Sequence, residues 1–109
     1  MKEISQMWED TEKEISTIKN IRNYLKEDVF TVEREQYLDT DRKRWITSKY
    51  ILTIALNGPT IHFDTDYNIS VFHGGEQTSY LTHDEGAQKN IDRISNFLRD
   101  EYNSFRSEH

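Results

Sequence analysis

Residues 44–64 read RWITSKYILTIALNGPTIHFD, and this stretch decides the fold of the chain. Two runs of alternating apolar and polar side chains flank Asn57, Gly58 and Pro59. A spacing of two is the period of a β-strand. Glycine accepts a positive φ, and proline cannot continue a hydrogen-bonded ladder, so the three residues break the strand. The stretch therefore predicts two strands joined as a hairpin.

Further strands are predicted on both sides of this hairpin. Phe30 and Val32 begin a strand before it, and a polar turn at residues 39–41 ends that strand. Ile69 and Val71 lead a strand after it, and Gly74-Gly75 predicts a tight hairpin into a weaker strand near residues 77–81. Short connections favour antiparallel neighbours, so we expect an antiparallel meander of four or five strands.

Apolar residues at spacings of three and four predict an amphipathic helix at each end. The N-terminal helix is expected to run for about seven turns without a break. Its apolar stripe consists of Ile4, Met7, Trp8, Thr11, Ile15, Ile18, Ile21 and Leu25. The C-terminal helix begins after a capping box at Thr82 and Glu85. The predicted fold class is α+β, a two-layer sandwich with both helices on one face of the sheet.

Composition narrows the classes of protein to consider. The 109 residues are expected to form one α+β domain, 1–109. Cysteine is absent and no signal peptide or membrane span is recognised, which predicts a cytoplasmic protein that does not enter a membrane. A net charge of −6 disfavours nucleic-acid binding. No phosphate-binding loop or other cofactor motif is present, so no cofactor is expected.

The outer face of the predicted sheet carries more apolar side chains than solvent requires. If Ile46 and Leu52 face the helices, strict alternation turns Trp45, Ile51 and Phe72 away from them, together with Ala55 and His62. These three apolar residues suggest a second covered surface, such as a homodimer interface. Scattered exposed apolar side chains are also common and need no special cause.

The turn of the first hairpin is the best candidate contact site. A five-residue loop, 39–43, would place Tyr37 opposite Trp45 and present Arg42, Lys43 and Arg44. Tyrosine, tryptophan and arginine are enriched at the energetic centres of protein interfaces. The alternative interpretation is that the aromatic pair holds the hairpin together while the cations protect a sheet edge.

These observations favour a small protein-interaction or accessory module that acts as a homodimer and binds a further protein. Enzyme signatures are absent, which favours a non-enzymatic role. One alternative is a small metal-dependent enzyme that uses His62 and Asp64, since both lie on the same face of one strand. Another is an acidic inhibitor or mimic that binds a basic partner.

Overall fold

Five strands form a single antiparallel meander in the computed structural model, which describes residues 3–108, with side chains through Tyr102. Neighbouring strands follow one another in sequence, in the order β1-β2-β3-β4-β5. The strands are β1 (Thr31–Asp39), β2 (Arg44–Ala55), β3 (Thr60–Asp64), β4 (Asn68–His73) and β5 (Glu76–Leu81). The α+β prediction is confirmed, and the weakly patterned fifth strand is present.

The N-terminal helical region is broken, so the prediction of one long helix there is wrong. It consists of α1 (Ile4–Ser16) and α2 (Ile21–Glu27). Asn20 has extended backbone angles, and its side-chain oxygen accepts a hydrogen bond from the backbone N–H of Asn23 at 3.0 Å. Asparagine is a favoured N-cap because it satisfies a free N–H at a helix start. A new helix therefore begins there, although the apolar spacing continues across the break.

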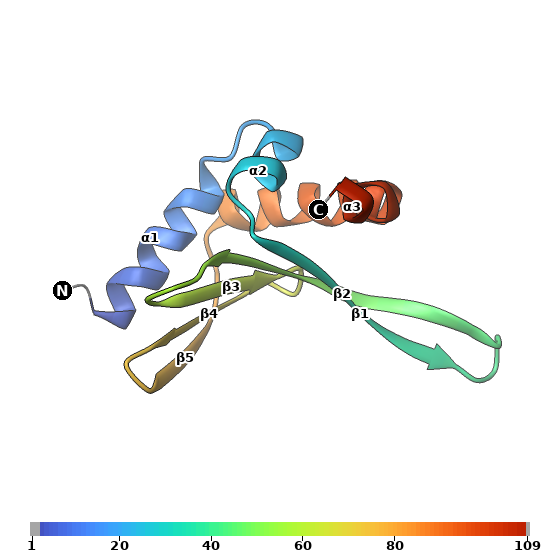
Figure 1. Ribbon diagram of the computed structural model, residues 1–109, viewed down its shortest axis with the longest axis horizontal. Helices are drawn as coiled ribbons and strands as arrows, with labels where there is room; N and C mark the ends of the chain where they lie inside the picture. Colours follow the sequence, from blue (N-terminus) through green and yellow to red (C-terminus); the bar gives the residue numbers. More distant parts are fainter. Residues whose placement is uncertain (1–2, 109) are drawn as a thin grey trace.

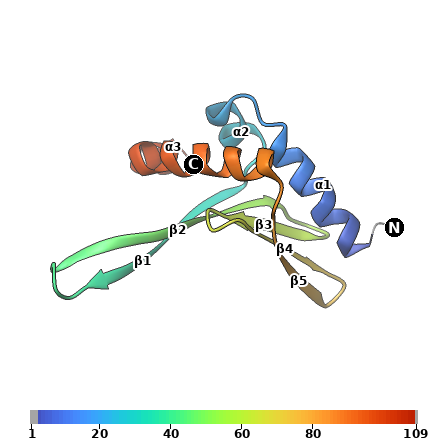
Figure 2. The same ribbon diagram turned by 180° about the vertical axis from the view of Figure 1, so that it is seen from behind.

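The helices lie on one face of the sheet, as Figures 1 and 2 show from opposite sides. The third helix, α3 (Glu85–Glu108), passes over the centre of the sheet, and α1 lies above β4 and β5. None of the described helices combines the length and the apolar character needed to cross a membrane. The largest fully buried side chains come from both layers: Ile15, Leu25, Leu52, Phe63, Ile69, Ile91, Ile94 and Leu98.

A bulge between β2 and β3 changes which side chains face the helices. Thr53 pairs with His62, but the next pair joins Ala55 to Ile61, which leaves Ile54 as an extra residue. Ile61 in turn pairs with the fully buried Val71. Since directly paired residues share a face of the sheet, Ala55 lies on the helix side. The expectation that Ala55 faces away is wrong because strict alternation does not survive a bulge.

The end of α1 is tied to α3 by one buried amide. Asn90 is 5% exposed, and its Nδ2 donates to the backbone oxygens of Ile15 at 2.7 Å and Ile18 at 3.2 Å. Carbonyls in the last turn of a helix lack partners within the helix. The Ile15 oxygen also accepts from the backbone N–H of Ile18 at 3.2 Å, so Asn90 supplies it with a second donor. Asn90 therefore stabilises the chain where α1 ends.

We expect Asn90→Ala to lower the free energy of unfolding by about 1–3 kcal/mol, because the backbone oxygens of Ile15 and Ile18 would lose the donor that the Asn90 amide supplies. Urea denaturation followed by circular dichroism measures the change. Asn96→Ala is the matched control, since Asn96 is exposed on the same helix. Equal effects of the two substitutions would contradict the assigned role.

Candidate functional site: the β1–β2 arm

The hairpin of β1 and β2 extends beyond the helical layer as a two-stranded arm (Figure 1). We define the arm as residues 36–47, the part of the hairpin from the bulge described below to the loop. The molecule measures 48 Å along its longest axis and 29 Å and 28 Å along the other two. The arm lies along the long axis and accounts for much of this elongation.

An extra residue in β2 marks the point where the arm begins. Glu35 pairs with Lys49 and the next pair joins Gln36 to Thr47, so Ser48 has no partner in the ladder. The Ser48 hydroxyl lies 3.2 Å from both the backbone oxygen and Oε1 of Glu35, and it donates toward them. Such a bulge bends its strand and reverses the facing of every residue beyond it.

This bulge corrects two expectations about the hairpin. Tyr37 pairs with Ile46, and Trp45 pairs with Leu38, so the predicted pair of Tyr37 and Trp45 does not form. Asp39 pairs with Arg44, so the loop is one residue shorter than the predicted 39–43. The sequence pattern carries no signal for a residue that is left unpaired within a strand.

The same bulge exchanges the two faces of β2 within the arm, whereas β1 keeps its alternation. Val32 packs against the buried core, and Leu38 follows it by an even number of residues in the same uninterrupted strand. Leu38 and its partner Trp45 therefore lie on the helix side, whereas Tyr37 and Ile46 lie on the outer side. The expectation that Trp45 faces away from the helices and Ile46 toward them is wrong.

Three large apolar side chains of the arm are left open to solvent. Trp45 is 63% exposed, Tyr37 is 52% exposed and Leu38 is 50% exposed. They occupy both faces of the arm, and the exposure shows that the helical layer does not cover them. Leu38 is a member of this group that the sequence analysis missed, because its importance depends on the register.

The loop at the end of the arm is ordered by Asp39. Its Oδ1 accepts hydrogen bonds from the backbone N–H groups of Asp41 at 3.0 Å and Arg42 at 3.2 Å. Its Oδ2 lies 3.7 Å from Nε of Arg42, and Lys43 has a φ of 54°. Exposed ion pairs contribute little stability, so the loop conformation depends mainly on the backbone contacts. This conformation presents the side chains of Arg42, Lys43 and Arg44 to solvent.

The six predicted contact residues do not form one surface. Tyr37, Arg42, Arg44 and Trp45 belong to the arm and its loop. Ile51 pairs with Asp64 and Phe72 with Thr60, which places both on the outer face of the sheet, where each is half-buried. The arm is therefore the place where most of the predicted residues meet.

His62 and Asp64 share the outer face, as predicted, but Asp64 is already engaged in local structure. Its Oδ1 accepts from the backbone N–H groups of Asp66 at 2.9 Å and Asn68 at 3.2 Å, and its Oδ2 lies 3.3 Å from Nζ of Lys49. The negative charge of this carboxylate is the main reason that the pKa of Lys49 is raised. Among the described side chains, no group of three histidine or acidic residues is placed to hold a metal ion.

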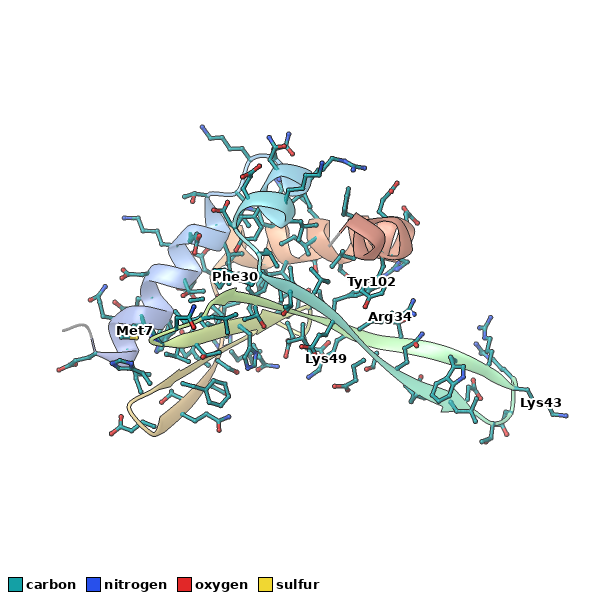
Figure 3. All side chains as sticks on the ribbon, in the orientation of Figure 1. Met7, Phe30, Arg34, Lys43, Lys49 and Tyr102 are labelled. Carbon is teal, nitrogen blue, oxygen red and sulfur yellow. The ribbon has the colours of Figure 1, made fainter. Side chains whose placement is uncertain are left out.

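The base of the arm is held to α3 by aromatic side chains (Figure 3). The Tyr50 hydroxyl donates to the backbone oxygen of Leu98 at 3.3 Å, and the rings of Tyr50 and Tyr102 are 5.5 Å apart. The guanidinium of Arg34 lies 4.6 Å from the centre of the Tyr102 ring. Burial raises the pKa of Tyr50, although the charge of Arg34 opposes it. Tyr50 therefore keeps the proton that it donates to α3.

Comparisons with protein-family models, curated proteins and solved structures found no match to this chain.

The two tryptophans allow the exposure of the arm to be measured in solution. Trp8 is stacked on Tyr80 with ring centres 3.4 Å apart, whereas Trp45 is largely exposed. In Trp8→Phe, we expect long-wavelength emission from Trp45 that acrylamide quenches strongly. In Trp45→Phe, emission from Trp8 should be less accessible to acrylamide. Equal quenching of the two variants would contradict an uncovered arm.

Proposed function

We propose that this chain is a protein-interaction module that acts as a homodimer and binds another protein through its arm. The observation that carries the proposal is the exposure of Tyr37, Leu38 and Trp45 on an element that extends away from the core. Leu38 and Trp45 are directly paired on one face of the arm, and exposed apolar groups that are gathered in this way are typical of binding surfaces. Tryptophan and tyrosine are also frequent among the residues that dominate binding energy.

The charge of the arm indicates the kind of partner. Its loop carries the three cations Arg42, Lys43 and Arg44 against the two carboxylates of Asp39 and Asp41, so the tip has a small positive charge on a chain whose net charge is −6. A cationic tip on an acidic body would attract a partner surface that combines acidic side chains with an apolar pocket. The same charge disfavours the alternative of an acidic mimic, because a basic partner would be repelled at this site.

Substitution of Trp45 tests the arm against an equally exposed apolar residue elsewhere. Phe30 is 57% exposed and lies on the body near the start of β1 (Figure 3). For any protein captured by the wild-type chain, we expect Trp45→Ser to weaken binding by about 30-fold or more, since central interface residues contribute about 2 kcal/mol. Phe30→Ser should leave the affinity nearly unchanged.

Binding measured by calorimetry at two salt concentrations completes this test. Higher salt should weaken binding, because it screens exposed charges. Equal losses in Trp45→Ser and Phe30→Ser would contradict the role of the arm.

The homodimer is supported by the difference between the two edges of the sheet. The β1 edge carries Glu33, Arg34, Glu35 and Asp39, and charges of this kind discourage strand pairing. In the β5 edge, Glu76 is the sole charged residue. In both ribbon views, no other described element lies along the outer edge of β5. An open edge with a single charged residue at its end is suited to pairing with a strand of a second copy.

The bonding pattern of β5 indicates how the copies would pair. The backbone N–H of Thr82 donates to the backbone oxygen of Tyr67 at 2.8 Å. Backbone hydrogen bonds between antiparallel strands involve every second residue, so Thr82, Tyr80, Thr78 and Glu76 direct their backbone groups toward β4. The remaining residues, Gln77, Ser79 and Leu81, direct their backbone groups outward. An antiparallel pair centred on Ser79 and Ser79 of the partner subunit would use all of these groups. No like charges would then face each other within the paired strands.

A cysteine at the centre of this edge tests the dimer without interference, because the natural chain has no cysteine. We expect light scattering to give twice the 13.1 kDa of one chain. Ser79→Cys should then form an intermolecular disulfide, since residues paired across antiparallel strands are within disulfide reach. Glu33→Cys, on the other edge, should not. A monomer would contradict the dimer, and a dimer without the Ser79→Cys crosslink would contradict this interface.

A further inference from the structure

A small cavity between the base of the arm and α3 is lined by cationic and neutral side chains, although the chain as a whole is acidic. Its volume is about 200 Å³, and none of its lining residues is an aspartate or glutamate. We call it the basic pocket, defined by Arg34, Thr47, Thr65, Ser95 and Arg99. In a chain with a net charge of −6, a concave surface without carboxylates is suited to an anion.

Two cations of the basic pocket are free to bind a ligand. Neither Arg34 nor Arg99 forms a salt bridge with a carboxylate among the described side chains. Lys49 also borders the cavity, but its ammonium group is 3.3 Å from Asp64 and is thereby neutralised. The charge available to a ligand therefore comes from the two guanidinium groups.

The two arginines are positioned by different elements. Arg34 comes from β1, and its guanidinium is held over the Tyr102 ring at 4.6 Å (Figure 3). Arg99 comes from α3, one turn after Ser95, so both residues lie on the same side of that helix. An anion in the basic pocket would lie between the strand and the helix and would be contacted from both.

Hydroxyl groups supply further donors. The Oγ1 of Thr65 accepts a hydrogen bond from the backbone N–H of Tyr50 at 3.0 Å, which leaves the hydroxyl proton of Thr65 available to a ligand. Thr47 and Ser95 contribute two more hydroxyls to the lining. Arginine forks combined with hydroxyl donors match the oxygens of a phosphate group better than those of a neutral ligand.

We propose that the basic pocket binds a phosphate group. The group comes either from free inorganic phosphate or from a phosphorylated serine of a bound peptide. The second source depends on the proposed function, because a peptide along the arm would pass the basic pocket. In both cases the guanidinium groups of Arg34 and Arg99 bind the phosphate oxygens, and the hydroxyls complete the shell.

Calorimetric titration of the full chain tests the proposal with two probes, inorganic phosphate and a phosphoserine peptide with its unphosphorylated form as the reference. Binding of either phosphorylated probe supports the proposal and identifies the source. We expect Arg99→Gln to weaken binding at least about tenfold, since it removes a charge-assisted contact. Lys89→Gln is the matched control, because Lys89 is exposed on α3 outside the basic pocket and the change in charge is the same.

A second variant separates charge from geometry at the other arginine. Arg34→Lys keeps the positive charge but removes the planar fork of the guanidinium group. We therefore expect it to bind phosphate more weakly than the wild type does. A thermal melt shows that the variant remains folded, since Arg34 also contacts Tyr102.

The proposal that the basic pocket binds phosphate would be overturned if neither probe bound. It would also be overturned if Lys89→Gln and Arg99→Gln lowered the affinity equally. Neither result would alter the dependence of partner binding on Trp45, so the two proposals can fail separately.

Discussion

The apolar contact between α3 and the centre of the sheet is the interaction on which the other features depend. Ile94 and Leu98 of α3 belong to one buried cluster with Leu52 and Phe63 of the sheet. Burial of such side chains contributes about 1.5–3 kcal/mol each, far more than any exposed ion pair of this chain. This contact sets the height of α3 above β2, and therefore the position of every group that α3 and β2 share.

The arm can extend into solvent because this contact holds its base. Tyr50 and Arg34 reach Tyr102 and the backbone of α3 at the edge of the core, and beyond them the two strands depend mainly on each other. An isolated pair of strands is only marginally stable in water, so an anchored base is needed for an arm of this length. The anchoring also forms the basic pocket, because it brings β1 and α3 together without closing the space between them.

The distribution of charge separates the body from its contact surfaces. The chain is acidic overall, yet cations gather at the end of the arm and around the cavity at its base. Both places include residues of the same hairpin, so an acidic or phosphorylated partner that binds along the hairpin would meet cations at each of them. A homodimer paired through β5 would place the two arms at opposite ends of a shared sheet, and two linked sites bind a repeated partner more tightly than one.

The sequence by itself determined the fold class, the order of the elements and most of the core. The alternation in residues 44–64 and the helical stripe from Ala87 to Leu98 are local patterns, and each follows from the geometry of one element. The sequence also singled out Tyr37, Arg42, Arg44 and Trp45 as arm residues, because the turn and the aromatic residues are visible in the pattern.

Only the tertiary structure decided how the strands are paired. One unpaired residue, Ser48, turned Trp45 to the helix side, where it pairs with the exposed Leu38. The basic pocket was equally invisible in the sequence, because it joins Arg34 to Arg99 across 65 positions of the chain. Contacts between distant residues and the register of strands depend on how elements meet, and no local period records that.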